Sequence, residues 1–192
     1  MTTHSYLSFP HEYSAELLPG LPSGANQHDI FYYPGATESG RLEGVVVKVS
    51  PKSQAPWIGV FAFGYPENEY SESNGIYSCP NPHALCVVSD GDAFVVDTNA
   101  PKNWTIVRCT PVLTVKSLVE HQLLLFIDFS SIWAWGTDGL KWYANVAHDG
   151  LEVEGVNESS VYGRAFGPVP GKESVYFEVE LQSGKVTGGN CI

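Results

Sequence analysis

The second half of the chain is a succession of short apolar segments separated by turns, and this pattern restricts the fold more than any other feature. From residue 85 onward, segments rich in Val, Ile and aromatic side chains alternate with short polar stretches. Several of these stretches carry Asp-Gly, a strong signal for a two-residue hairpin turn, or Ser-Gly. They are Asp90-Gly91, Asp138-Gly139, Asp149-Gly150 and Ser183-Gly184. We therefore predict an all-β fold of antiparallel sheets built from hairpins.

The side-chain pattern within these segments supports strands. Apolar and polar residues alternate along 151–156 and along 175–182, as expected for strands with one buried and one solvated face. The run LLLFI at 123–127 is continuously apolar and indicates a central strand covered on both faces. The longer stretch 117–129 could also form a buried helix. We favour strands there because the neighbouring segments are rich in β-branched and aromatic residues.

The first half is less regular. Residues 1–43 are dense in Pro, Gly and aromatic residues, which predicts an irregular arm packed over one edge of the sheets. Residues 44–63 contain two strand candidates. Residues 64–84 form a polar loop rich in Pro and Gly, and loops of this length are often functional, so it is the best place to look for an adaptable binding element. We expect one domain spanning 1–192.

Charge and composition exclude several classes of protein. The net charge is −11 while 43% of the residues are apolar, so the chain is not a disordered acidic polymer. Scarce Lys and Arg argue against nucleic acid as a partner. No apolar run is long enough for a membrane span, and no secretory signal is visible. We expect a cytoplasmic protein with reduced thiols, although a secreted protein whose leader has been removed would look the same.

A weak repeat runs through residues 85–188. An apolar strand, a short polar turn, a second strand, a turn containing Gly and an aromatic strand follow one another, most clearly in LLLFIDFSSIWAWGTDGLKW. This pattern resembles the blades of PQQ-type and related β-propellers. A full propeller needs at least four blades of about forty residues, so the resemblance implies two or three blade-like sheets, packed as a sandwich or a partial propeller. The resemblance assigns no functional residue.

The densest group of soft metal ligands is Cys79, His83 and Cys86. These residues are our candidate metal ligands, although their spacing departs from that of common zinc sites. A disulfide between Cys79 and Cys86 is an alternative, as is a loop that leads Cys86 into a core strand. Cys79 with His83 is also the only local pair suited to a cysteine nucleophile, but the prolines around Asn81 explain this segment without catalysis.

Aromatic residues supply a second candidate site. Trp133 and Trp135 are two positions apart on one predicted strand, so both indoles point to the same face and could form a platform for a sugar or another ligand. An aromatic core layer is the alternative that we favour. Tyr70 and Tyr77 of the 64–84 loop are further candidates for ligand binding.

Three functions remain. The leading hypothesis is a non-enzymatic protein-interaction or accessory protein, of which a bacterial immunity-type protein is one example, because an acidic surface attracts basic partners. The first alternative is a carbohydrate-binding module or a hydrolase acting on glycosides. The second is a metal-dependent enzyme using residues 79–86. The signatures of P-loop, Rossmann, α/β-hydrolase and zincin proteins are missing from the sequence. We therefore assign no catalytic residue and expect no cofactor.

Overall fold

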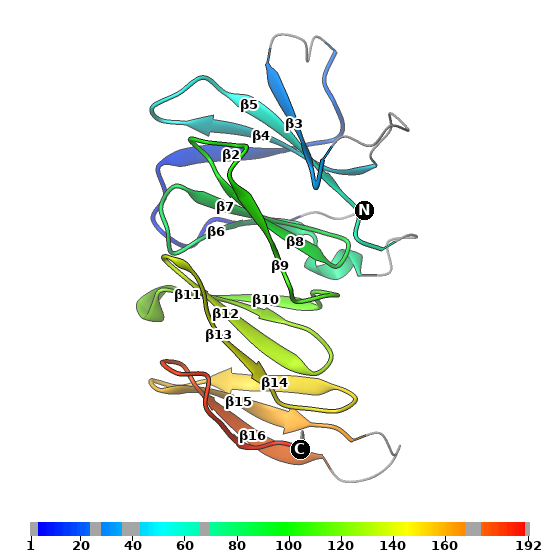
Figure 1. Ribbon diagram of the computed structural model, residues 1–192, viewed down its shortest axis with the longest axis vertical. Coiled ribbons are helices and arrows are strands. Elements are labelled where there is room, and N and C mark those ends of the chain that lie inside the picture. The colour runs from blue at the N-terminus through cyan, green and yellow to red at the C-terminus, as the bar shows by residue number, and fades with distance from the viewer. Residues whose placement is uncertain (1–3, 24–27, 36–42, 66–69, 168–173, 191–192) are drawn as a thin grey trace. The chain divides into compact units, whose positions relative to one another are not determined.

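The chain folds almost entirely into β-strands (Figure 1). The computed structural model describes residues 4–23, 28–35, 43–65, 70–167 and 174–190. These contain two short 3-10 helices, η3 (Ser71–Ser73) and η4 (Val119–His121). The strands are β1 (His4–Tyr6), β2 (Tyr13–Leu18), β3 (Asp29–Tyr33), β4 (Gly44–Pro51), β5 (Trp57–Ala62), β6 (Gly75–Ser78), β7 (Ala84–Ser89), β8 (Asp92–Asp97), β9 (Trp104–Val107), β10 (Thr114–Leu118), β11 (Leu123–Ile127), β12 (Ser131–Gly136), β13 (Gly139–Asn145), β14 (Leu151–Val156), β15 (Ser160–Ala165), β16 (Val175–Glu180) and β17 (Val186–Gly188). The all-β prediction is confirmed.

The strands form four open sheets in two compact units. Unit 1 (Met1–Val112) contains sheet I, with strand order β2-β4-β5-β3, and sheet II, with order β1-β6-β7-β8-β9. Unit 2 (Leu113–Ile192) contains sheet III, β10-β11-β12-β13, and sheet IV, β14-β15-β16-β17. Neighbouring strands are antiparallel except for β1 beside β6 and β3 beside β5. The expectation of a single domain stays a prediction.

The main apolar cluster of unit 1 is drawn from both of its sheets. Val47, Trp57 and Phe61 of sheet I share this cluster with Ile76 and Phe94 of sheet II. Burying each large apolar side chain contributes on the order of 1.5–3 kcal/mol to folding. Aromatic side chains of sheet I also donate hydrogen bonds to backbone carbonyls in or beside sheet II. They run from Tyr13 Oη to Ala84 O, from Trp57 Nε1 to Thr98 O, and from Tyr33 Oη to Pro101 O, at 2.9, 2.9 and 2.7 Å.

The segment predicted as an irregular arm contains three strands, so the prediction is wrong at those positions. Strands β1, β2 and β3 lie within 1–43, and each joins a sheet. In β2, Tyr13 is buried while Ser14 and Glu16 are exposed, so a period of two was present in the sequence. The surrounding Pro and Gly residues concealed this period, because they indicated where strands end rather than whether strands form.

The predicted 64–84 loop is also shorter than expected. Residues 75–78 form β6, which lies between β1 and β7 and is buried along its whole length. The 3-10 helix η3 precedes β6, and β7 begins at Ala84. Part of the predicted loop, 66–69, lies outside the described residues. The irregular sequence around β6 therefore hides a central strand of sheet II.

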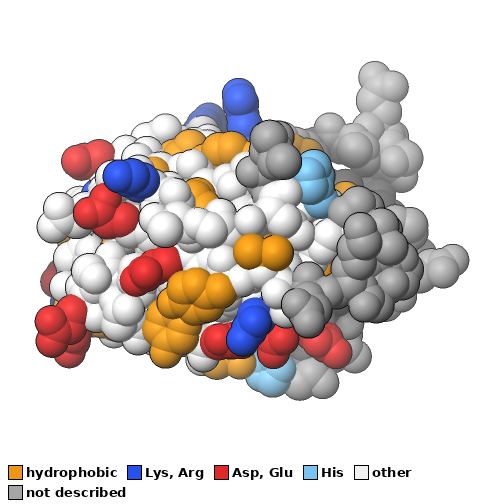
Figure 2. Space-filling model, turned by 90° about the horizontal axis from the view of Figure 1, so that it is seen from below, with side chains coloured by type: hydrophobic (Ala, Val, Ile, Leu, Met, Phe, Trp, Pro, Cys, Tyr) orange, Lys and Arg blue, Asp and Glu red, His pale blue; other side chains and the backbone are white. Residues whose placement is uncertain are grey.

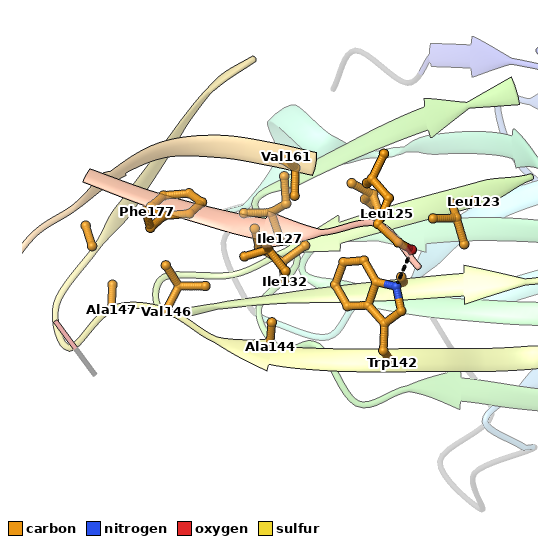
Figure 3. Packing of buried hydrophobic residues seen from close by; sticks show 14 residues of the cluster. Leu123, Leu125, Ile127, Ile132, Trp142, Ala144, Val146, Ala147, Val161 and Phe177 are labelled. Carbon is orange, nitrogen blue, oxygen red and sulfur yellow. Dashed lines mark hydrogen bonds between the residues drawn. The ribbon is translucent and has the colours of Figure 1, made fainter. Parts of the chain in front are cut away.

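Unit 2 encloses its own core between sheets III and IV (Figure 3). Leu125 and Ile132 of sheet III pack in one cluster with Val161 and Phe177 of sheet IV. Trp142 belongs to the same cluster, and its indole Nε1 donates a 2.7 Å hydrogen bond to the carbonyl of Leu181. The ambiguous stretch 117–129 forms the end of β10, the single turn η4 and strand β11, so the strand interpretation is confirmed.

The Ser183-Gly184 turn depends on its glycine. Gly184 has φ +71°, a conformation that L-residues with a side chain rarely adopt, and a Cβ there would lie 2.9 Å from atoms of Trp142. The turn can therefore approach the indole only because position 184 has no side chain.

Sheets III and IV each consist of four consecutive antiparallel strands paired in chain order. Sheet II contains a third such series, β6 to β9, to which β1 adds a parallel strand. Four-stranded sheets of this kind are the units of β-propeller blades. The resemblance of residues 85–188 to blade repeats is confirmed at the level of these sheets, but the expected two or three sheets are too few, because the described strands form four. Within the described ranges, no helix is long and apolar enough to cross a membrane.

Candidate protein-interaction site

The two candidate tryptophans lie on the same face of β12, as predicted. Both are half-buried, and they lie on the face opposite to Ile132 and Ala134, which point into the core of unit 2. Trp133 and Trp135 are therefore absent from the cluster that joins sheets III and IV. The expected aromatic layer in that core is supplied by Trp142 and Phe177 instead.

The Trp133 indole is held by its own hairpin. Its ring lies 4.4 Å from that of Tyr143, centroid to centroid, at an angle of 47°. Its Nε1 donates to Ser131 Oγ at 2.9 Å, and Ser131 Oγ donates to Asp128 Oδ2 at 2.6 Å. The other carboxylate oxygen, Oδ1, accepts the backbone N–H groups of Ser130 and Ser131. This network accounts for the polar atoms of the indole and makes it part of the turn between β11 and β12.

The candidate tyrosines belong to the packing of unit 1. Tyr77 is buried, stacks on Tyr6 with ring centroids 5.2 Å apart, and donates from Oη to the carbonyl of Ser73. Burial raises the pKa of its hydroxyl well above the ordinary value. Tyr70 is half-buried, lies edge-on to Tyr65, and its backbone N–H donates to Asp90 Oδ1 at 2.8 Å.

The candidate metal ligands are not assembled into a metal site. Cys79 and Cys86 are fully buried and form no disulfide, and burial raises the pKa of both thiols. His83 is exposed, with Nδ1 lying 3.2 Å from Asn99 Nδ2. Across the described ranges, no three His, Cys, Asp or Glu side chains are grouped closely enough to hold a metal ion. The prediction of a ligand trio at Cys79, His83 and Cys86 is therefore wrong.

The alternative of a Cys79–Cys86 disulfide is also wrong, and the strand register explains why. Tyr77 pairs with Cys86 across β6 and β7, so Cys79 lies two positions beyond the residue opposite Cys86. Diagonal neighbours of this kind are about 7–8 Å apart in an antiparallel ladder. That separation exceeds the usual Cα–Cα distance of a disulfide.

Two adjoining clefts lie on unit 2, on either side of η4. The first, of about 440 Å³, lies between η4 and the turn from β14 to β15. The second, of about 300 Å³, lies between the end of η4 and the turn from β12 to β13. His121 lines both. The first cleft is lined by Leu118, Val119, Glu120, His121, Val156, Asn157 and Glu158, and the second by His121, Gln122, Gly136, Thr137, Asp138, Gly139, Leu140 and Lys141. We call this pair the His121 clefts.

The lining of the His121 clefts combines carboxylates with exposed apolar side chains. Glu120 and Glu158 line the first cleft and Asp138 lines the second; in the part of the chain that the structure describes, none of the three forms an ion pair. Val119 and Leu140 are 37% and 50% exposed, which is high for apolar residues. Lys141 also lines the second cleft, but the three carboxylates outnumber it, so the lining as a whole suits a cationic group on an aliphatic stem.

A left-handed residue shapes the wall between the clefts. Gln122 has φ 53°, one of two positive values among the described residues other than glycine. This conformation ends η4 and turns the chain into β11, and Gln122 Nε2 donates to Val119 O at 2.8 Å. Non-glycine residues in this region cost about 1–2 kcal/mol and concentrate at functional sites.

The opposite wall of the first cleft is a hydrogen-bonded turn. Asn157 Oδ1 accepts the backbone N–H groups of Ser159 and Ser160 at 2.9 and 2.8 Å. This is the arrangement that Asp128 makes in the turn from β11 to β12. The Asn or Asp side chain fixes the backbone conformation of such a turn. The backbone that carries Glu158 is therefore held in one conformation.

The sequence predictions did not include the His121 clefts. Glu120, His121 and Gln122 form a polar triplet between two apolar runs, and this triplet was the available signal for a chain reversal. We considered 117–129 only as strands or as a buried helix, so the turn itself was not recognised as part of a site. The second wall, at Asn157 and Glu158, could not be paired with the first from the sequence, because the two are distant along the chain.

Comparison with known proteins gives little further information. No family model matches the chain, and no curated protein matches it. Among solved structures, the chain is similar to one described as the crystal structure of the N-terminal domain of Nup159, with 10% sequence identity and a TM-score of 0.42. The match covers 98% of this chain and 53% of that one, so the chain spans about half its length. A likeness at this level carries no statement about function.

Proposed function

We propose that the protein is a non-enzymatic interaction or accessory protein whose His121 clefts receive a basic segment of a partner protein. The observation that carries this proposal is the juxtaposition of Glu120, Glu158 and Asp138 around two adjoining clefts, without ion pairs within the described residues. Carboxylates that line an open cleft and form no ion pair can bind cationic side chains of a partner.

The chemistry of the clefts favours Lys or Arg side chains in the partner. Their aliphatic stems would contact Val119 and Leu140, while their charged ends would meet the carboxylates. The net charge of −11 would speed the encounter with a basic surface. A cytoplasmic location and the exclusion of nucleic acid remain predictions from composition.

The test compares two triple variants with the same net charge. The cleft variant is Glu120→Gln, Asp138→Asn and Glu158→Gln, and the control is Glu16→Gln, Asp29→Asn and Glu43→Gln, three exposed positions of unit 1. Each triple removes three negative charges. A partner isolated with the wild-type chain from cells that naturally make it should be lost with the cleft variant and retained with the control.

Two results would contradict the proposal. Equal weakening by both triples would show that bulk charge alone attracts the partner. Undiminished binding by the cleft variant would show that the partner contacts another surface. Circular dichroism and thermal unfolding of both triples establish that loss of binding does not reflect loss of fold.

A further inference from the structure

Sheet IV has an outer face that points away from the core of unit 2. Its inner residues, such as Val161 and Phe177, belong to the core, while the alternate positions of the same strands lie on the other side. Four glutamates and one arginine stand on the outer face, so these strand positions carry a net negative charge. They are Glu152, Glu154, Glu178, Glu180 and Arg164. Acidic and apolar side chains gather together on the surface visible in Figure 2.

Two tyrosines lie on this face. The rings of Tyr162 and Tyr176 are 6.4 Å apart, centroid to centroid, at an angle of 33°. Tyr162 lies against Gly155, where a Cβ would come within 2.4 Å of its hydroxyl oxygen. The strand register shifts at this glycine, between Val153 and Gly155. The bulge and the missing side chain therefore make room for the Tyr162 ring, while Tyr176 remains 47% exposed.

Carboxylates surround the tyrosine pair. Tyr162 is paired with Glu178 across β15 and β16, and Arg164 is paired with Tyr176. Desolvation raises the pKa of the Tyr176 hydroxyl, and the nearby Glu178 and Glu154 carboxylates raise it further. Arg164 reaches Glu154 through a single Nε–Oε1 contact of 3.3 Å. Lys185, whose carbonyl accepts the backbone N–H of Glu180, adds a second cation at the edge of this face, so carboxylates still outnumber basic side chains there.

We propose that the outer face of sheet IV docks a segment of a partner protein through an arginine side chain. The guanidinium would lie on the exposed ring of Tyr176 and donate to Glu178, because Glu154 is already paired with Arg164. Arginine fits better than lysine because its planar group stacks on aromatic rings and donates in a fork to carboxylates. Complementary charge supports this occupant over an acidic or a purely apolar one.

This proposal is independent of the His121 clefts. The two surfaces share no residue, so either could bind while the other does not. They are close in space, because Ser160 Oγ lies within hydrogen-bonding reach of both Asn157 Oδ1, in the wall of the first cleft, and Glu178 Oε1, on the outer face.

The test titrates the full chain with a decamer of arginine and, separately, a decamer of lysine. The wild type should bind the arginine decamer more tightly. Tyr176→Ala should weaken arginine binding roughly three- to fivefold, from loss of the cation–π contact, and reduce the preference for arginine. Tyr176→Phe retains the ring and should bind as the wild type does. Tyr32→Ala, an exposed tyrosine of unit 1, is the matched control.

Three outcomes would overturn the proposal: no binding of the arginine decamer, equal affinity for both decamers, or an unchanged arginine preference in Tyr176→Ala. The cleft triple variant separates this proposal from the proposed function. That variant should keep the preference for arginine even if its overall affinity falls. Because Tyr176 is exposed, the Tyr176→Ala variant should fold as the wild type does. Thermal unfolding of Tyr176→Ala, compared with that of Tyr176→Phe, checks this.

Discussion

The two units of the chain use the same turn signal in opposite surroundings. Asp90-Gly91 in unit 1 and Asp138-Gly139 in unit 2 both reverse the chain between antiparallel strands. Asp90 is fully buried, whereas Asp138 is exposed and lines a His121 cleft. The dipeptide therefore specifies a reversal but not its environment, which depends on whether other segments cover the turn.

The covering of Asp90 is polar and incomplete. Asn74 Oδ1 accepts the backbone N–H of Asp90, and Asp90 Oδ1 accepts that of Tyr70. Among the described residues, Asp90 Oδ2 and Asn74 Nδ2 find no hydrogen-bonding partner, although both atoms are buried. At this turn unit 1 thus keeps a carboxylate inside, whereas the Asp138 carboxylate of the corresponding turn in unit 2 lines a His121 cleft.

The largest expected effect concerns the two cores. Phe94→Ala in unit 1 and Phe177→Ala in unit 2 each truncate a fully buried ring and should cost about 3–5 kcal/mol of unfolding free energy. If the chain is one domain, chemical denaturation will show a single transition that both variants shift. Two transitions, each shifted by one variant only, would contradict the single-domain prediction. Leu21→Ala, at an exposed position, should change little.

A smaller effect is expected at the two turns. Asp90→Ala removes the acceptor of the Tyr70 N–H and places alanine at φ 44°, so it should lower the free energy of unfolding by about 1–3 kcal/mol. Asp138→Ala should stay within about 0.5 kcal/mol of the wild type. The free energy of unfolding of both variants is measured by urea denaturation. Equal losses in Asp90→Ala and Asp138→Ala would contradict the expected difference between the buried and the exposed turn.

The smallest effect is a pair of opposite pH dependences within unit 1. Burial raises the pKa of Asp92, so its charge opposes folding at neutral pH, and Asp92→Asn should be more stable than the wild type there. Lys52 lowers the pKa of Glu12, through a contact of 2.6 Å, so Glu12→Gln should be less stable at neutral pH.

Both differences should vanish in acid, where the carboxyl groups are protonated in the folded and the unfolded chain. The Asp92 carboxyl is protonated in both states at a pH below its ordinary pKa of 3.8, and the Glu12 carboxyl at a pH below its lowered folded-state pKa. Unfolding curves measured from pH 7 down to acid check this. A gain of stability in both variants at neutral pH, or a loss in both, would contradict the opposite pKa shifts of Asp92 and Glu12.

The sequence predicted the fold class because the strand signals are local. Alternation along 151–156 and 175–182, and the Asp-Gly turns, depend on neighbouring residues only. Strands β1 and β3 were missed because their stabilising partners, β6 and β5, are distant along the chain and pair with them in parallel. A short segment that is stabilised by a distant neighbour carries little signal of its own.

The candidate sites were predicted less well, for a related reason. The concentration of Cys79, His83 and Cys86 reflects a strand pair whose register buries the thiols and leaves the imidazole exposed. The His121 clefts, by contrast, combine residues from three separated segments, which only folding brings together. The alternation in β14 and β16 predicted a solvated face that carries the glutamates and Tyr176, but the proximity of Tyr162 to Tyr176 was not predicted, because the two rings come from different strands.

One titration tests the central claim, that unit 2 presents the surfaces for a basic partner. Backbone amide chemical shifts of the ¹⁵N-labelled full chain are followed while the arginine decamer is added. We predict shifts at 118–122, 136–141 and 156–158 around the clefts, and on β15 and β16 for the outer face. Shifts spread evenly over the acidic residues of both units, or confined to unit 1, would contradict the claim.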